Sequence, residues 1–485
     1  MDMKKLFSVI IQIFIPLLWV FSMVLLAGQS DIGSERLQIN DIFSQAPESL
    51  AGQSWAGIYL KDEKIGYGYQ SYQQSDKGVI YKEYMLMRIP LGGSLREVIA
   101  DNFALLDSSL SVKSFSAGMT SGEYDVTIHG LVDNGRLELT YLSGGKKNTK
   151  TIPIENNLYF QGQITRLVKR TGFKEGEFSA PVFDPLSMTI AELNVDVSSP
   201  VIEDADTVYN LGLDMNGIKT TMLVDSEGNL IKETQPGGMM LKGENRETAL
   251  AMENIYSGDK DFLVTLSVPS SEVIINDRNV RYFKAELKGI EYESYRLDDG
   301  STQRLVNTRP PIIEITRGNN IHRGAIDRDE YLQSTDFVQA DDEQIVELAR
   351  KLTAGLTANR EKAFAIADWV YENIEKDITV SVPSAVEVLR VKRGDCNEHT
   401  ALYTALARAA GLPTKVIVGI VYKDGIFYYH AWPAVFLGYW HQLDPTFGQH
   451  TADATHIQLL EGGIEKQTEL VNVVGKLEVK VLDYN

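Results

Sequence analysis

The sequence predicts an α+β protein in which a large antiparallel β-rich region precedes a C-terminal domain of mixed helices and strands. Two observations carry this prediction. From Trp55 onward, apolar and polar residues alternate with the period of two that half-buried strands require, and turn-forming runs separate the candidate strands. From Asp341 onward, apolar residues recur at helical spacing before two further strand-like runs, at 426–432 and 440–444.

The β-rich region is expected over residues 54–316. Its first hairpin joins 58–60 to 65–69 through a charged turn at 61–64. Further strands are expected at 84–89, 98–105, 124–129, 137–141, 208–213, 218–224 and 230–233. Two short helices are expected to interrupt the strands, over 159–171 and 188–193. The pattern therefore predicts two antiparallel blocks on either side of a helical middle. Whether these blocks form two separate subdomains stays open.

The helical domain is expected over residues 340–485, after a polar connection at 317–339. Asp341 or Asp342 can cap its first helix, because a side-chain oxygen at that position accepts from a free backbone N–H. A second helix follows Thr357, and a third is expected at 384–391.

The N-terminus predicts export. Lys4 and Lys5 precede the apolar stretch 6–27, which is close to the roughly 20 residues that span a bilayer. Residues 1–30 are interpreted as a signal anchor that holds the protein in the membrane or as a cleaved signal peptide, and residues 31–53 as a tether. Because the basic flank stays inside, the remainder is expected to be extracytoplasmic, in the periplasm or cell envelope.

The charge balance argues against a nucleic-acid partner. The chain carries 47 Lys and Arg against 66 Asp and Glu, a net charge of −19. A nucleic-acid binder needs a basic face to neutralise phosphates.

Cys396 is the single cysteine, so the chain has no intramolecular disulfide. Asp395 is a suitable N-cap for a helix over 397–410, which places the thiol in the first helical turn. The free N–H groups and the macrodipole there are expected to stabilise a thiolate. The same groups could stabilise an oxyanion formed at a carbonyl.

His430 and Asp444 lie in two neighbouring strand-like runs, and the connection 437–439 lies midway between them. A hairpin folded there places His430 roughly opposite Asp444, with Cβ atoms about 5 Å apart. The spacing therefore predicts a carboxylate–imidazole pair.

These residues resemble the bacterial transglutaminase-like domain of the papain-like cysteine superfamily. The resemblance covers roughly 340–460 and rests on Gly-Asp-Cys-Asn-Glu-His at 394–399, Ala405–Pro413, His-Ala-Trp at 430–432 and Leu-Asp-Pro-Thr at 443–446. It implies that Cys396 is the nucleophile, His430 the general base and acid, and Asp444 the residue that orients His430. It implies acyl transfer or hydrolysis at peptide or isopeptide amides through a thioester, with no cofactor.

Two alternatives stay open. A zinc site could use Cys396, His399, His430 and Asp444, whose residue types suit zinc. The chain could be a non-catalytic envelope scaffold or binding module that retains the fold. His450 and His456 are interpreted as surface or packing residues. If the domain is an enzyme, its location makes envelope proteins or peptidoglycan stem peptides the candidate acyl donors, and the oligomeric state stays open.

Overall fold

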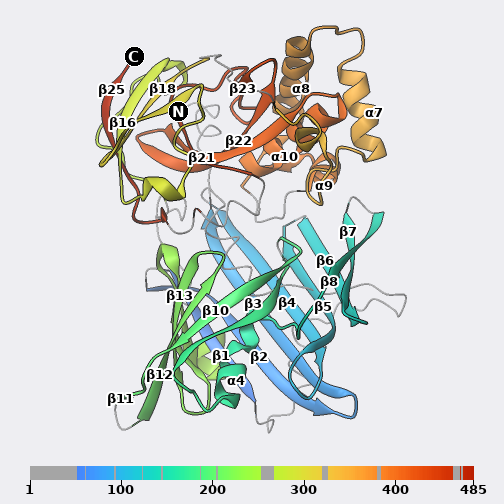
Figure 1. The fold of residues 1–485 in the computed structure, drawn as a ribbon, viewed down its shortest axis with the longest axis vertical. Coiled ribbons are helices and arrows are strands. Elements are labelled where there is room, and N and C mark those ends of the chain that lie inside the picture. The colour runs from blue at the N-terminus through green and yellow to red at the C-terminus, as the bar shows by residue number, and fades with distance from the viewer. Residues whose placement is uncertain are drawn as a thin grey trace. The chain divides into compact units, whose positions relative to one another are not determined.

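The computed structural model describes residues 52–60, 62–91, 94–122, 124–143, 146–185, 187–203, 206–252, 267–318, 326–378, 384–462, 470 and 473–485. The chain divides into two compact units, one within Leu17–Pro90 and Ser94–Asp259, here the β-rich unit, and one within Lys260–Asn485, here the C-terminal unit (Figure 1). The expected signal at 1–30 lies outside the described residues, as does the tether apart from its last two residues. Over the described ranges, no helix is both long enough and apolar enough to cross a membrane.

The β-rich unit is built on one antiparallel sheet, which has 15 strands over the described residues. The path runs β8-β7-β6-β5-β4-β3-β2-β1-β15-β14-β13-β12-β10-β9, and β11 pairs with β12. The strands are β1 Gln53–Leu60, β2 Glu63–Ser75, β3 Gly78–Leu91, β4 Ser94–Leu106, β5 Val112–Ser121, β6 Tyr124–Asp133, β7 Arg136–Ser143, β8 Lys146–Pro153, β9 Gly176–Asp184, β10 Thr189–Val197, β11 Val201–Glu203, β12 Asp206–Met215, β13 Ile218–Asp225, β14 Leu230–Thr234 and β15 Met239–Glu244.

The helical middle of this unit is shorter than expected. Residues 159–171 form η3 Gln161–Gln163 and α4 Ile164–Arg170, as the sequence predicted. The helix expected over 188–193 is wrong, because these residues open strand β10. Buried and exposed side chains alternate along β10, with Leu193 and Val195 buried. The segment therefore pairs as a strand in the sheet, although its local sequence pattern also suited a helix. The described part of the unit also contains two short helices, η4 Pro236–Gly238 and α5 Arg246–Leu250.

The C-terminal unit contains two four-stranded sheets over the described residues. One has the order β17-β18-β16-β25 and the other β23-β22-β21-β24. Their strands are β16 Tyr282–Lys288, β17 Gln303–Thr308, β18 Pro311–Thr316, β21 Thr414–Lys423, β22 Ile426–Phe436, β23 Trp440–Gln442, β24 His456–Glu461 and β25 Glu478–Tyr484. The two-residue strands β19 Glu375–Lys376 and β20 Arg393–Gly394 pair in parallel.

Strands β16 to β18 belong to the C-terminal unit, although the sequence analysis assigned them to the β-rich region 54–316. The reason is the antiparallel pairing of β16 with β25, in which Ala285 lies opposite Val481. The residue pattern of a strand does not indicate with which distant strand it pairs, so this pairing could not be predicted from the sequence.

Helix α10 Cys396–Ala409 forms the centre of this unit (Figure 1). It packs against α7 Glu343–Leu352, α8 Asn359–Asn373, α9 Ala385–Val391 and strand β22. The cluster at this junction comprises side chains from each element, among them Ile345, Ala349, Ile366, Val370, Val388, Leu402, Leu406, Val435 and Leu443. The 3-10 helices η5 Asp277–Asn279, η6 Tyr292–Ser294 and η7 Glu330–Leu332 lie in the connecting segments. The burial of α10 on nearly every side fixes the position of its first residue, Cys396.

Candidate active site

Cys396 is the first residue of α10, as the sequence predicted. The Asp395 side chain accepts a hydrogen bond from the Asn397 backbone N–H at 2.8 Å, and the Glu398 side chain accepts from the Asp395 N–H at 2.8 Å. This reciprocal capping box satisfies two N–H groups that a helix start otherwise leaves free. It therefore holds the thiol at a defined point beside the helix terminus.

Gly394 makes this tight start possible. A Cβ at this position would lie 2.3 Å from Glu398 Cβ and 2.4 Å from Glu398 Cγ. Any larger residue would therefore displace the side chain that closes the capping box.

His430 lies on β22 with its side chain fully buried. Its ring stacks on Phe447, with centroids 5.1 Å apart, and on Trp432, at 5.9 Å. On the paired strand β21 the residue opposite His430 is Gly419. A Cβ there would lie 2.0 Å from the Ile457 backbone oxygen and 3.0 Å from Trp432 Cη2, so the glycine is required by the close approach of the next strand and of the Trp432 ring.

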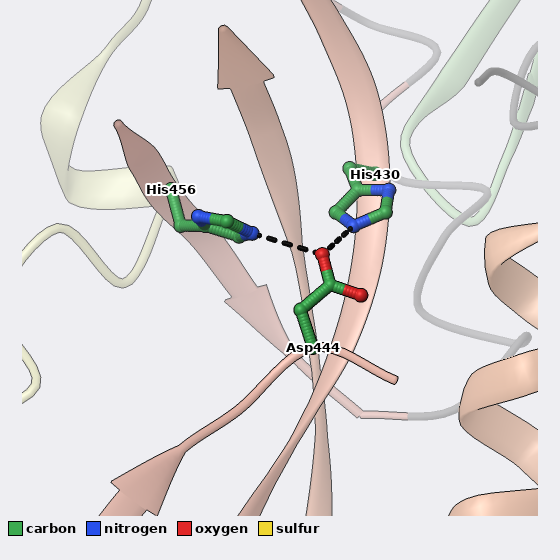
Figure 2. A group of neighbouring side chains, drawn as sticks. All are labelled: His430, Asp444 and His456. Atoms are coloured by element: carbon green, nitrogen blue, oxygen red, sulfur yellow. Dashed lines mark hydrogen bonds and ion pairs between the residues drawn. The ribbon is translucent and has the colours of Figure 1, made fainter. Parts of the chain in front are cut away.

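Asp444 follows β23 in a tight bend, where it exchanges backbone hydrogen bonds with Gln449 at 2.8 Å. Its Oδ1 accepts from the backbone N–H groups of Thr446 and Phe447, at 2.7 and 3.1 Å. Its Oδ2 lies 2.8 Å from His430 Nε2 (Figure 2). The structure thus brings His430 and Asp444 together, and the bend orients the carboxylate.

The tautomer of His430 follows from this contact. An ionised carboxylate only accepts hydrogen bonds, so Nε2 carries the proton that faces Asp444. Nδ1 is then the basic nitrogen of the neutral ring. Nδ1 is buried and has no hydrogen-bond partner in the described part of the chain. It is therefore available to receive a proton from a group that approaches it.

Cys396 lies beside the backbone of the residue that follows His430. The Ala431 backbone N–H donates to the Cys396 sulfur. The carbonyl of the same residue is also bonded to the helix, because the Thr400 hydroxyl donates to the Ala431 carbonyl oxygen at 3.0 Å. Helix α10 and strand β22 are thus joined by the side chains of Cys396 and Thr400, which lie one turn apart on the helix and both bond to the backbone of Ala431. The thiol bonds to the Ala431 N–H, which is the group next to His430.

The expectation of a thiolate stabilised by the helix start is wrong for this structure. Cys396 is only 2% exposed, and burial raises the pKa of its thiol well above the usual value. The Asp395 carboxylate raises the pKa further, and the Ala431 N–H lowers it too little to compensate. The capping acid that positions the thiol therefore also disfavours its ionisation, and together with burial it outweighs the stabilisation expected from the helix macrodipole.

Burial likewise lowers the pKa of His430, against the opposing effect of Asp444. Asp444 itself is ionised: burial favours its neutral form, but His430 and His456 hold the pKa of its carboxyl well below the usual value. The resting site therefore combines a neutral thiol, a neutral imidazole and an ionised carboxylate.

The residues of the zinc alternative do not come together as a set. Over the described ranges, the group with metal-binding potential is His430, Asp444 and His456, whose nearest ligand atoms lie within 4.8 Å of one another. Neither Cys396 nor His399 belongs to it, and His399 Nδ1 instead lies 2.7 Å from the Asp395 carbonyl. Both histidines of this group already bond to Asp444 Oδ2, which is the geometry of a hydrogen-bonded ion network.

His456 is the functional candidate that the sequence analysis missed. It was interpreted as a surface or packing residue. It is buried, at 2% exposure, which fits packing, but its Nε2 also lies 3.1 Å from Asp444 Oδ2 (Figure 2). The available signal was the strand-like run that it opens, which forms β24 and pairs with β21.

Comparisons with known proteins identify a family within the C-terminal unit. Residues 346–445 match the model of the transglutaminase-like superfamily, a range that includes Cys396, His430 and Asp444 but not His456. The chain is 28% identical over 126 residues to the kyphoscoliosis peptidase of Mus musculus, which covers 22% of this chain and 19% of that protein. It is 32% identical over 101 residues to an uncharacterized protein of Haemophilus influenzae, which covers 20% of this chain and 27% of that protein. The matches thus span a minor part of each relative.

Two solved structures are similar in part. A Cytophaga hutchinsonii protein described as a "Putative Cysteine Protease" has 15% identity and a TM-score of 0.28, covering 42% of this chain and 86% of that one. A beta-barrel-like protein from Brucella abortus has 13% identity and a TM-score of 0.32, covering 40% and 94%. Both TM-scores are too low to establish a shared overall fold. The family match and the curated relatives carry the conclusion that residues 346–445 of this chain form a transglutaminase-like domain.

Proposed function

We propose that the C-terminal unit is a thiol enzyme of papain-like α+β type that transfers or hydrolyses acyl groups at peptide or isopeptide amide bonds. Cys396 is the nucleophile, His430 the general base and acid, and Asp444 the residue that orients His430. One observation carries the proposal. Asp444 holds His430 Nε2 at 2.8 Å, which leaves His430 Nδ1 buried and without a partner in the described part of the chain. The next residue, Ala431, bonds the Cys396 sulfur through its backbone N–H, so the thiol lies close to this base.

The proposed reaction has two balanced steps. The Cys396 sulfur attacks the amide carbonyl carbon, and its proton passes through His430 Nδ1 to the leaving nitrogen as the carbon–nitrogen bond breaks. This yields a thioester and a free amine. Water or a second amine then attacks the thioester, His430 takes the proton of the attacking group, and the thiol leaves with that proton. Asp444 stabilises the imidazolium that exists between the proton transfers.

Nucleophilic attack from this resting state couples deprotonation to bond formation. Burial disfavours both a free thiolate and a free imidazolium, so a preformed ion pair is not the resting form. The 2% exposure of Cys396 also means that a substrate must displace covering side chains before it reaches the sulfur.

A non-catalytic binding module is the second candidate. The observation that favours it is the same burial of Cys396, which suits an inert core thiol as well as a closed active site. The two candidates differ in one chemical respect, because a binding module forms no covalent intermediate.

The test is a search for the thioester. The full chain is incubated with a pool of peptides and isopeptides, quenched in acid and measured by intact mass spectrometry. An adduct on Cys396 that hydroxylamine removes supports the enzyme, and Cys396→Ser serves as the matched control that forms no thioester. A chain that forms no adduct with any amide or activated ester, while remaining folded, would favour the binding module.

Export and the acyl donor are part of the proposal. The apolar stretch 6–27 behind Lys4 and Lys5 supports an extracytoplasmic location, which makes envelope proteins and peptidoglycan stem peptides the first donors to assay. Protease added to intact spheroplasts should digest the exported domains. Digestion only after lysis would contradict the location.

A further inference from the structure

His456 and His430 share one carboxylate oxygen. Asp444 Oδ2 lies 3.1 Å from His456 Nε2 and 2.8 Å from His430 Nε2 (Figure 2). Because Asp444 Oδ1 already accepts two backbone N–H groups, the carboxylate is fully engaged. His456 therefore contacts the orienting carboxylate as directly as the proposed base does.

The second ring nitrogen of His456, Nδ1, also faces hydrogen-bond acceptors. Its Nδ1 lies 3.1 Å from the Asp453 backbone carbonyl and 3.4 Å from Asp453 Oδ1. With an acceptor at each ring nitrogen, both nitrogens must donate, and only the imidazolium has two N–H groups. The hydrogen-bond geometry thus identifies His456 as a buried cation.

Asp453 is held in turn by groups that favour its charge. Arg278 Nη1 and Gln449 Nε2 each donate to Asp453 Oδ2 at 2.9 Å, and Thr455 donates to Oδ1 through its backbone and its hydroxyl. Arg278 comes from η5, outside the residues that match the family model. Its guanidinium lies 4.6 Å from the centroid of the Phe447 ring, which stacks on His430.

We propose that His456 is a positioning residue of the thiol site: as a cation between Asp444 and Asp453, it keeps Asp444 ionised and directed at His430 while leaving His430 neutral. This role rests on the proposed function. Arg278 completes the network by balancing the second carboxylate.

The charge balance gives the physical reason for a second histidine. A buried carboxylate needs a counter-charge, and with His430 as its nearest cationic candidate it would favour the imidazolium form of that ring. An imidazolium cannot take a proton from the thiol. His456 supplies the counter-charge instead, and its positive charge lowers the pKa of His430, as does that of Arg278. Asp453 and Asp444 together raise the pKa of His456 to about 9, against the effect of burial, so the cation persists at neutral pH.

A purely structural role for His456 predicts a different outcome. Its ring also packs edge-on against Trp432, with centroids 5.1 Å apart. A packing residue would change stability when replaced but would leave the titration of His430 unchanged. The pKa of His430 therefore separates the two roles.

The test is a histidine titration of the full chain, labelled with ¹³C-histidine and followed by NMR. The chain has seven histidines, and the His430 signal is assigned by its loss in His430→Gln. His456→Gln keeps a donor toward Asp444 but removes the charge. We expect it to raise the pKa of His430 by at least about one unit. Asp453→Asn should act in the same direction, because it weakens the stabilisation of the His456 cation.

The matched control is His450→Gln, since His450 is partly exposed and pairs with Asp368. It should leave the His430 titration unchanged. An unchanged or lowered pKa of His430 in a folded His456→Gln chain would overturn the proposal. If His456→Gln does not fold, an unchanged or lowered pKa of His430 in Asp453→Asn would overturn it instead. The titration needs no substrate, so failure of Cys396 to form a thioester would refute the enzyme proposal without affecting this result.

Discussion

His430 Nε2 donates to Asp444 Oδ2 at 2.8 Å within a fully buried pair, and this contact assigns the two ring nitrogens different roles. Nε2 is held by the carboxylate, and Nδ1 remains the nitrogen that can accept a proton. The orientation of the pair is thus the feature on which the proposed chemistry depends.

Asp444→Asn tests that orientation. The amide can donate to Nε2, which favours the tautomer with its proton on Nδ1 and leaves no base for the thiol. We expect the rate of Cys396 acylation by p-nitrophenyl acetate to fall by about 10³–10⁴-fold, as in other triads with the wrong tautomer. The measurement is the release of p-nitrophenol in stopped flow. An acylation rate within a few-fold of wild type would show that Asp444 does not orient the base.

Asp395→Asn separates the capping role of Asp395 from its charge. Asparagine keeps the side-chain oxygen that accepts from the Asn397 N–H, so the helix start should persist. Loss of the negative charge should lower the pKa of Cys396, because the Asp395 carboxylate is the largest cause of its rise after burial. We expect faster alkylation by iodoacetamide at pH 8, with Asp341→Asn on the exposed surface as control. A slower reaction in a folded chain would contradict this electrostatic account.

The His456 cation should leave a signature in stability. Its folded pKa of about 9 lies above the usual 6.5, so its contribution is fully present below pH 6.5 and is lost as the pH rises through 9. The difference in unfolding free energy between wild type and His456→Gln should therefore shrink by about 3 kcal/mol from pH 6 to pH 10. Urea unfolding followed by tryptophan fluorescence measures it. A difference that does not vary with pH would mean that His456 is not a buried cation.

Glu233 makes a separate prediction for the β-rich unit. Its side chain is 1% exposed and accepts from Gln235 Nε2 at 2.6 Å. Burial raises its pKa from 4.5 to about 7, so its protonated form stabilises the fold below pH 4.5 and this contribution is lost as the pH rises through 7. Glu233→Gln should therefore raise the unfolding free energy at pH 8 by up to about 3 kcal/mol and flatten its pH dependence.

Urea unfolding of this unit, followed by far-UV circular dichroism at pH 5 and pH 8, measures the effect. The exposed carboxylate of Glu192 on β10 provides the matched control, Glu192→Gln. Equal pH dependence in wild type and Glu233→Gln would exclude a buried titrating carboxyl.

The features that the sequence predicted well are local. Asp342, one of the two candidates for its helix start, and Asp395 cap their helices, because a cap depends on neighbours two or three residues away. The His430–Asp444 contact could be predicted because one short hairpin, β22–β23, precedes Asp444, but the predicted register was wrong. Ala434 lies opposite Gln442, so Asp444 lies beyond β23 and reaches His430 from the bend that follows that strand. The helix predicted over residues 188–193 was wrong because pairing of β10 with β9 in the sheet decided the structure of a segment whose local pattern suited both a helix and a strand.

The features that the sequence could not predict depend on tertiary contacts. His456 reaches Asp444 through the pairing of β24 with β21, and Arg278 reaches Asp453 from a segment far earlier in the chain. The pKa of Cys396 depends on its burial, which the helix start alone does not determine.

Comparing the pH dependence of Cys396 acylation in wild type and His430→Gln shows whether His430 is the base for Cys396. Because Cys396 is the single cysteine, intact mass spectrometry counts acyl groups on one sulfur. We predict that wild type is acylated once near neutral pH, that His430→Gln is slower by about 10³-fold or more, and that Cys396→Ala gains no hydroxylamine-sensitive group. Equal rates in wild type and His430→Gln across the pH range would show that His430 is not the base for Cys396.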